Sequence, residues 1–382
     1  MGDSDQCGNA VPRKEEALNS ALVTITTPLR NRRAVRWVSS SKNILQIVSG
    51  PHTSEIAMHR YVCEMQEACF QPGKPGFLSM ERDTVVSPLL LDVRPSASGN
   101  HFGTFINPIG ADQAEVYFPR KTMEVNGRAI CLHIPEGAGV FILDALIGLY
   151  RIIREINKKV PVLIPQNVNT RYKEYFSFLG LTDHDFVEVP NDSVAKVERA
   201  IFSSRSLATD TQALIGGKKR DFGALVEPVD LNDFNTKVQN SLGGRNRRRI
   251  FVSRRDVTSR QIENEEDLIN MLSEFGFEPM RLSEIPVPEL ISAFANAEIV
   301  VAPIGSGMVN VAFSPPGTPI IEIDHPHNDF VTHGVCRALE HPLNVHQPIS
   351  ATQRRRHATH AIHVNVEALR NAVRDNLASR TW

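Results

Sequence analysis

Long hydrophobic runs, a strong net charge and paired cysteines are all missing from this sequence of 382 residues. No apolar stretch is long enough to cross a bilayer, and the polar first twenty residues lack the apolar core of a secretory signal. The net charge of -1 creates no overall field that would attract nucleic acid or an acidic membrane. We therefore expect a cytoplasmic protein without a membrane span and without a nucleic-acid partner.

Several familiar site motifs are missing as well. The five cysteines form no CxxC pair, which favours free thiols in a reducing compartment. The phosphate loops GxxxxGK[ST] and GxGxxG are absent, as are the GxSxG turn of serine hydrolases and the HExxH helix of zinc proteases. Any active site must therefore be sought in less specific patterns.

What is present is an ordinary globular composition, 41% hydrophobic and 22% charged, in a chain long enough for two domains. We expect a polar, partly mobile arm at residues 1–40 and a first α/β domain at residues 41–225. A second α/β domain at residues 226–350 and a helical segment at residues 351–382 complete the chain. The boundary between the two domains is placed in Gly216–Phe234, a stretch rich in glycine, proline and charge.

Helix and strand patterns alternate in the later part of the first domain. Val140–Ile156 has apolar residues at helical spacing, and Thr170–Gly180 predicts an amphipathic helix that ends on a glycine. Short apolar runs at Val160–Pro165 and Asp185–Pro190 predict strands of a parallel sheet, and Thr84–Val93 is a further strand candidate. This alternation is typical of an α/β sheet domain.

The second half of the chain repeats strand–helix units more clearly. The predicted strands are Ile250–Val252, Phe277–Leu282, Glu298–Pro303 and Thr318–Asp324, and the predicted helices are Asn264–Gly276, Val287–Ala297 and Gly307–Phe313. This order predicts a doubly wound, Rossmann-like domain. An apolar stripe at Val366, Leu369, Val373 and Leu377 predicts a C-terminal amphipathic helix, which we expect to pack back on the first domain.

Polar residues and glycines gather at the predicted strand ends of the second domain, where open parallel sheets bind ligands. Ser253, Arg254 and Arg255 directly follow the first strand, and Arg260 lies a few residues further on. Guanidinium groups bind phosphate oxygens through paired hydrogen bonds, so these residues suit a diphosphate. A solvated basic turn is the alternative interpretation.

A glycine-flanked loop follows the third strand. Gly305, Ser306 and Gly307 would let the backbone approach a phosphate at the start of a helix. Asn310, on the first turn of that helix, could hydrogen-bond a base or a sugar. A turn that needs glycine only for its backbone conformation is the alternative.

Acids and histidines provide further candidates. Glu322, late in the last predicted strand, could accept both hydroxyls of a ribose, and Asp324 is a lesser candidate for this role. Asp144 lies among apolar residues of a predicted helix, where a buried carboxylate could act as a general base or be a satisfied structural acid. His325 and His327 stand two residues apart beside carboxylates, as in some metal sites, although most such loops bind no metal.

Several of these patterns occur together in one order. The segment FVSRRDVTSRQIENEEDLINMLSEFGFEPM, followed by LISAFANAEIVVAPIGSGMVNVAFSPPGTPIIEID, resembles the conserved half of family 61 glycosyltransferases. In that family an SRR segment after a strand precedes an NE-E helix, a PHGAGLTN segment and a PGT-strand-E segment. The resemblance runs from about Ile250 to Asp324. The first domain is more faintly similar, because GVFILDALIGLYRI resembles the family's HWLLDSLPRL helix.

The resemblance implies a GT-B architecture, in which two Rossmann-like domains face a cleft. It implies inverting transfer of a sugar from a nucleotide sugar, usually a UDP-sugar, to a glycan or another hydroxyl acceptor, with no required metal or other cofactor. By the same resemblance, Arg254 and Arg255 would neutralise the diphosphate, Gly305–Gly307 would approach the nucleotide and Glu322 would hold the ribose. Asp144 aligns with the family's aspartate and is the candidate general base.

The chain departs from the family pattern at two positions. Ile304 stands where the family has the histidine of PHGAG, and Val140 stands where the first-domain helix has its histidine. A second interpretation therefore stays open, a protein that binds nucleotide or glycan, or scaffolds an assembly complex, without turnover. The pair of His325 and His327 leaves a third, a metal-dependent hydrolase. The sequence also leaves self-association into a homo-oligomer, the donor sugar and the acceptor open.

Overall fold

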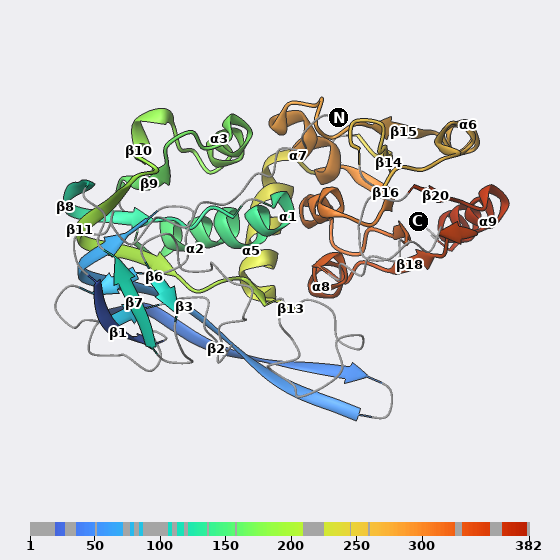
Figure 1. The fold of residues 1–382 in the computed structure, drawn as a ribbon. Coiled ribbons are helices and arrows are strands. Elements are labelled where there is room, and N and C mark those ends of the chain that lie inside the picture. The colour runs from blue at the N-terminus through green and yellow to red at the C-terminus, as the bar shows by residue number, and fades with distance from the viewer. Residues whose placement is uncertain are drawn as a thin grey trace, which may run out of the picture.

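A computed structural model describes most of the chain, and the described part contains two large β-sheets, with helices between and beside them, and two small two-stranded sheets (Figure 1). The described residues are 20–26, 36–49, 52–71, 77–79, 84–86, 106–108, 113–117, 121–135, 137–156, 159–208, 225–244, 246–258, 260–324, 331–351 and 361–379. In this part of the chain, no helix combines the length and the apolar character that crossing a membrane requires.

The first sheet has eleven strands, in the order β10-β9-β8-β11-β3-β4-β5-β1-β7-β6 with β2 paired to β3. The strands are β1 (Ser20–Thr26), β2 (Arg36–Ser49), β3 (His52–Phe70), β4 (Phe77–Ser79), β5 (Thr84–Val86), β6 (Ile106–Pro108), β7 (Gln113–Tyr117), β8 (Lys121–Cys131), β9 (Val162–Pro165), β10 (Phe186–Val189) and β11 (Ser193–Ser203). The strands β8 to β11 pair in parallel, but β11–β3, β2–β3, β3–β4 and β4–β5 are antiparallel.

This mixed sheet corrects two expectations. The predicted Rossmann-like first domain is right for the parallel strands β8 to β11 and wrong for the rest of the sheet, where every pair except β1–β5 is antiparallel in the described residues. Part of the predicted polar arm also forms strands, because Ser20–Thr26 pairs with β5 and β7 and β2 starts at Arg36. Of the predicted strand Thr84–Val93, the part Thr84–Val86 is confirmed and the rest lies outside the described residues.

The predicted helix at Val140–Ile156 is present with an unusual central turn. It consists of α1 (Ala138–Val140), a π-helical segment η2 (Phe141–Leu146) and α2 (Ile147–Ile156). A π-helical turn widens the helix by one residue and is often found at functional sites. The helix α3 (Thr170–Ser177) is also confirmed, with a short 3₁₀ turn η3 (Asp183–Asp185) before β10.

The second sheet confirms the doubly wound prediction. Its five strands are all parallel, in the order β15-β14-β16-β17-β18. The elements are β14 (Arg248–Val252), α6 (Glu265–Ser273), β15 (Phe277–Met280), α7 (Val287–Ala295), β16 (Ala297–Pro303), the 3₁₀ helix η4 (Ser306–Phe313), β17 (Ile320–Ile323), α8 (Val331–Ala338) and β18 (Leu343–His346).

The C-terminal helix packs on the second sheet. This helix, α9 (Val366–Ala378), contacts α6. Its residues Leu369 and Val373 are buried in the same apolar cluster as Leu268 of α6 and Phe251 of β14. The short hairpin of β19 (Ser350–Ala351) and β20 (Ile362–His363) precedes it. The expectation that this helix packs back on the first domain is therefore wrong.

One apolar core extends across both halves of the chain. It contains Ile130 and Val162 from the first sheet, Phe234 from α5 (Pro228–Leu242) and Ile250 and Val300 from the second sheet. Figure 1 shows α1, α2 and α5 between the two sheets. The two halves thus share their core instead of meeting only across an open cleft.

The helix α5 also revises the predicted boundary segment. Residues 209–224 lie outside the described part, a two-stranded sheet of β12 (Leu207–Ala208) and β13 (Leu225–Val226) flanks them, and α5 begins at Pro228. The helix α5 is hydrogen-bonded to the second half of the chain. Asn235 Nδ2 donates to the carbonyl oxygens of Ala312 (2.9 Å) and Ser314 (2.8 Å). The later part of the predicted linker is therefore a packed helix.

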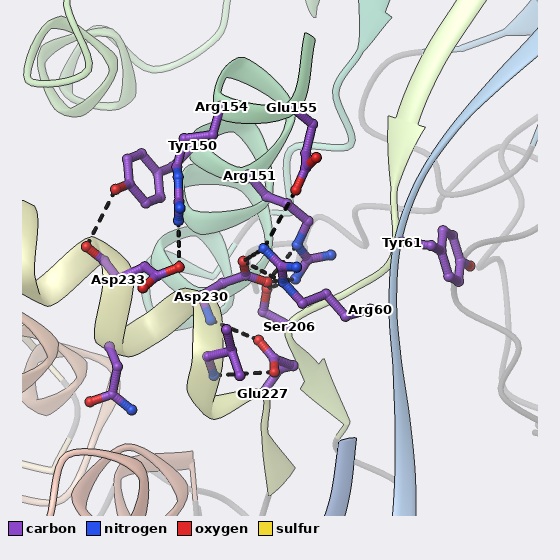
Figure 2. Close-up of polar contacts among 12 residues, drawn as sticks. Arg60, Tyr61, Tyr150, Arg151, Arg154, Glu155, Ser206, Glu227, Asp230 and Asp233 are labelled. Carbon is purple, nitrogen blue, oxygen red and sulfur yellow. Dashed lines mark hydrogen bonds and ion pairs between the residues drawn. The ribbon is translucent and has the colours of Figure 1, made fainter. Parts of the chain in front are cut away.

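A buried ionic cluster fastens α5 to the first half (Figure 2). The side chains of Arg151 on α2 and Asp230 on α5 are both 0% exposed and form an ion pair. Arg60 Nε donates to the other Asp230 carboxylate oxygen (2.7 Å), and Arg151 Nη1 donates to the carbonyl oxygen of Ser204 (2.9 Å). Burial by itself would raise the pKa of Asp230, but the charges of Arg151 and Arg60 outweigh it and lower that pKa. The cluster therefore holds an ionised carboxylate in the interior.

Candidate functional site

The strand order of the second sheet defines where a ligand can bind. Between β14 and β16 the connections leave to opposite faces of the sheet: α6 packs with α9 on one face, and η4 packs in the shared core on the other. Such a topological switch point opens a crevice at the carboxyl ends of the two strands. The residues that directly follow β14 and β16 therefore form the candidate site.

Two arginine side chains from the loop after β14 lie against the loop after β16. A Cβ atom placed on Gly305 would be 3.3 Å from Arg254 Nη1 and 3.3 Å from Arg260 Nη2, so both guanidinium groups contact this glycine. Arg254 is only 7% exposed, and burial together with the charge of Arg260 lowers its pKa. The Nε atom of Arg260 is buried without a hydrogen-bond partner among the described residues. Two like charges held together in this way are suited to a bound anion.

The backbone at Arg260 and Gly305 is adapted to this contact. Arg260 has φ +54°, which few residues other than glycine adopt, and Gly305 has φ +156° and ψ 176°, a region that L-residues rarely enter. The structure thus explains the first glycine of the Gly305–Ser306–Gly307 loop by the close approach of two cations.

Ser253 and Arg255 have other partners. Ser253 Oγ donates to Glu265 in the first turn of α6, and the backbone N–H of Arg254 donates to the same carboxylate (3.2 Å). The guanidinium of Arg255 pairs with Glu266. Ser253 therefore fixes the loop to α6, and Arg255 points toward α6 instead of Gly305. Arg254, Arg255 and Glu265 are among the residues that line a pocket of about 380 Å³ beside this loop.

The loop after β16 enters η4 at an exposed residue. Ser306 is exposed and Gly307 is half-buried, and η4 begins at Ser306. Asn310, by contrast, is buried: its Nδ2 donates to the Gly307 carbonyl oxygen (2.7 Å), and its Oδ1 accepts from the Tyr175 hydroxyl (3.2 Å). In this structure Asn310 stabilises the loop and ties it to α3.

Alanine at Gly305 is expected to weaken nucleotide binding. The added Cβ would press on both guanidinium groups and would strain the backbone, so that Arg254 and Arg260 must move apart. We expect the Kd for UDP, measured by calorimetry, to rise about tenfold, which corresponds to about 1.4 kcal/mol. Gly276→Ala, at φ +74° in the turn after α6, is the control for backbone strain alone. An equal loss of UDP affinity in both variants would contradict the prediction.

Glu322 lies at the same sheet edge but is covered. It is 1% exposed, one of its oxygens, Oε1, is 3.0 Å from His333 Nε2 of α8, and Oε2 is buried without a hydrogen-bond partner in the described part of the chain. Asp324, just after β17, accepts from Gln347 Nε2 (2.9 Å). In this conformation His333, and not the carboxylate, is the member of the pair that reaches the surface.

Asp144 lies in the π-helical segment η2 and is engaged through both oxygens. Arg205 forms an ion pair with it and donates from Nε to Oδ2 (2.6 Å), and the backbone N–H of Ser206 donates to Oδ1 (3.1 Å). The start of this helix touches the loop after β16, because a Cβ on Gly139 would be 2.8 Å from Val309 Cγ2 and 3.6 Å from Ser306 Cα. Val140 packs half-buried against the shared core, and Ile304 is buried.

The metal hypothesis gains no support from the described residues. Among them, no group of three or more His, Cys, Asp or Glu side chains is placed to hold a metal ion. His325 and His327 lie outside the described residues.

The comparison with known proteins gives one family match. Residues 139–321 match the model of the glycosyltransferase 61 family. The matched range runs from the first turn of α1 into β17, so it contains Asp144, the loop after β14 and the loop after β16. The family 61 resemblance of the sequence is thereby confirmed, and it supports a glycosyltransferase activity. A search of curated proteins found no significant match.

The sequence did not predict the contacts of three residues near the candidate site. For Glu265, the NE-E pattern predicts an acid in the first turn of a helix. Its hydrogen bond with Ser253 is visible only in the structure. Arg205 and His333 carry no signal in the sequence. Each becomes a candidate only through a partner far along the chain, Asp144 and Glu322 respectively.

Proposed function

We propose that the protein is a cytoplasmic inverting glycosyltransferase. It transfers a sugar from a nucleoside diphosphate donor, a UDP-sugar, to a hydroxyl group of a glycan or related acceptor. The observation that carries the proposal is the pair of Arg254 and Arg260 against Gly305 at the switch point of the second sheet. The family match over residues 139–321 supports the same reaction class.

The chemistry follows from where charge develops. As the acceptor oxygen attacks the anomeric carbon, the bond from that carbon to the diphosphate breaks and negative charge gathers on the phosphate oxygens. Two guanidinium groups fixed beside Gly305 stabilise this charge without reorganising, which is the most effective form of electrostatic catalysis. We propose that they fulfil the role for which many other transferases use a divalent cation.

The first half of the chain supplies the acceptor side in this proposal. The helix that contains Asp144 contacts η4 directly, and the pair of Asp144 with Arg205 therefore lies within about two helical turns of the donor loop. A polyhydroxylated acceptor fits a surface that offers both a carboxylate and a guanidinium.

The test is turnover of a donor panel. The protein is incubated with UDP- and GDP-sugars and a series of glycan acceptors in EDTA, and release of the nucleoside diphosphate is measured. We expect release that depends on both protein and acceptor and that EDTA does not suppress. If the protein binds no nucleoside diphosphate in calorimetry, the proposal is wrong.

A second candidate function is binding without turnover. It is favoured by the engagement of both Asp144 oxygens, which leaves the predicted general base occupied. Calorimetric binding of UDP together with no turnover across the panel would support this alternative over the transferase.

A further inference from the structure

The pair of Glu322 and His333 is a polar centre in which the predicted ribose-binding carboxylate already contacts a histidine. Glu322 lies near the carboxyl end of β17, its side chain is 1% exposed and its Oε2 atom has no hydrogen-bond partner among the described residues. Burying a carboxylate is unfavourable unless it has a partner that needs it. Its charge acts on its surroundings, since burial and the Glu322 carboxylate raise the pKa of Cys336 to about 12. The partner of Glu322 is His333, with Nε2 3.0 Å from Oε1.

His333 stands at the ligand-binding edge of the sheet. It is the third residue of α8, so it lies in the first turn, and its side chain is 28% exposed. The backbone N–H of Ile304 donates to the Ile323 carbonyl oxygen (2.9 Å), which joins the Gly305 loop to the residue after Glu322. The helix α8 also contacts η4. Only the short distance between two adjacent strands therefore separates the pair from the proposed diphosphate position.

The contact sets the chemistry of the imidazole. A carboxylate that accepts from Nε2–H holds the ring in one orientation and one tautomer, in which Nδ1 carries the lone pair. The same carboxylate stabilises the imidazolium that forms when Nδ1 takes a proton. A histidine oriented by a carboxylate in this way is suited to act as a general base.

We propose that His333 is the general base of the transfer and that Glu322 is its positioning residue. The proposal rests on the proposed function. The acceptor O–H bond breaks, the proton moves to His333 Nδ1 and the acceptor oxygen bonds to the anomeric carbon. The electron pair of the broken carbon–oxygen bond leaves with the diphosphate, beside Arg254 and Arg260. Asp144, whose carboxylate accepts from Arg205 and Ser206, then does not take the acceptor proton.

The experiment compares His333→Ala, His333→Gln, Glu322→Gln and Asp144→Asn with a control, His363→Ala. The control removes His363 of β20, an exposed histidine whose Nδ1 lies 3.6 Å from Glu263 Oε2. Turnover of the UDP-sugar that the wild type uses is measured together with the Kd for UDP. Circular dichroism confirms that each variant is folded, and glutamine keeps an N–H group for Glu322 at position 333.

Both His333 variants should lower kcat by about 10²–10⁴-fold, as expected when a general base is lost. Their Kd for UDP should change by less than about twofold. Glu322→Gln should lower kcat about 10- to 100-fold. Asp144→Asn should lower kcat less than the His333 variants do, His363→Ala should retain wild-type kcat, and added imidazole should restore part of the activity of His333→Ala.

Four outcomes would overturn the inference: wild-type kcat in the His333 variants, a loss of UDP affinity equal to the loss of kcat, absence of imidazole rescue, or a loss of kcat confined to Asp144→Asn. A wild-type protein that binds UDP but turns over no donor would instead refute the proposed function, and the inference with it. The two failures are therefore distinguishable.

Discussion

Replacement of both Arg254 and Arg260 by alanine is expected to abolish most of the transfer activity. Each guanidinium can form charge-assisted hydrogen bonds, which contribute about 1.5–3 kcal/mol apiece. Loss of two such groups therefore removes about 3–6 kcal/mol of stabilisation from the leaving diphosphate, which corresponds to a fall in kcat/KM of about 10²–10⁴-fold. The measurement is steady-state kinetics with the donor that the wild type uses.

Arg255 provides the matched comparison for that double variant. It is adjacent to Arg254 in the sequence, but its guanidinium pairs with Glu266. The hydrogen bond with Glu266 raises the pKa of Arg255 above the ordinary arginine value. Arg255→Ala should therefore lower kcat/KM by less than about threefold, since an exposed ion pair contributes little. A larger effect from Arg255 than from Arg260 would show that the sequence-based pair, and not the pair at Gly305, neutralises the diphosphate.

Replacement of Asp230 by alanine is expected to cause the largest loss of stability. It would leave Arg151 buried without its carboxylate, and removal of one partner from a buried ion pair destabilises a protein by about 3–5 kcal/mol (Figure 2). The measurement is the free energy of unfolding in urea, followed by circular dichroism. Because the pKa of Asp230 is lowered in the folded protein, this stabilisation is present above the ordinary aspartate pKa of about 4 and is lost as the pH falls through the lower folded value.

Asp233 is the control on the same helix. It lies one turn from Asp230 and pairs with Arg154 of α2, but the two side chains are 40% and 46% exposed. Asp233→Ala should therefore lower the free energy of unfolding by less than about 1 kcal/mol. The double variant Arg151→Met with Asp230→Leu should recover part of the loss seen in Asp230→Ala, because it leaves no guanidinium at position 151. Equal losses for Asp230 and Asp233 would contradict the assignment of the buried pair as a stabilising contact.

The second sheet could be predicted because its signals are local. Apolar runs such as Ile250–Val252 mark buried parallel strands, and Gly276 takes the positive φ (+74°) expected after a helix. Asn264 shows where local reasoning ends. It occupies the predicted N-cap position, but its side chain bonds the backbone of Val364, both N–H (3.0 Å) and carbonyl (2.9 Å), 100 residues away. Such a partner leaves no trace in the helix pattern.

The first sheet and the C-terminal helix were harder for the same reason. An amphipathic stripe such as Leu369 and Val373 shows that a helix has a buried face, but not which surface covers it. Antiparallel pairing of β3 with β11 joins residues more than 120 positions apart, for example Phe70 with Ala195. In the site, the strand ends were predictable, whereas the contact of both Arg254 and Arg260 with Gly305 is visible only in the fold.

The shared core has a consequence for dividing this chain. Phe234 of α5 packs against Phe313 of η4, with ring centroids 6.0 Å apart, and Arg171 of α3 donates to the Ile285 carbonyl oxygen (2.9 Å). Cutting the protein between its two sheets would expose this apolar surface on both fragments and leave such donors unsatisfied. Chimeras that exchange the second sheet with that of a relative must therefore carry α5 along with η4, or redesign the contacts between them. For this protein the unit of modular exchange is larger than the sheet that holds the candidate site.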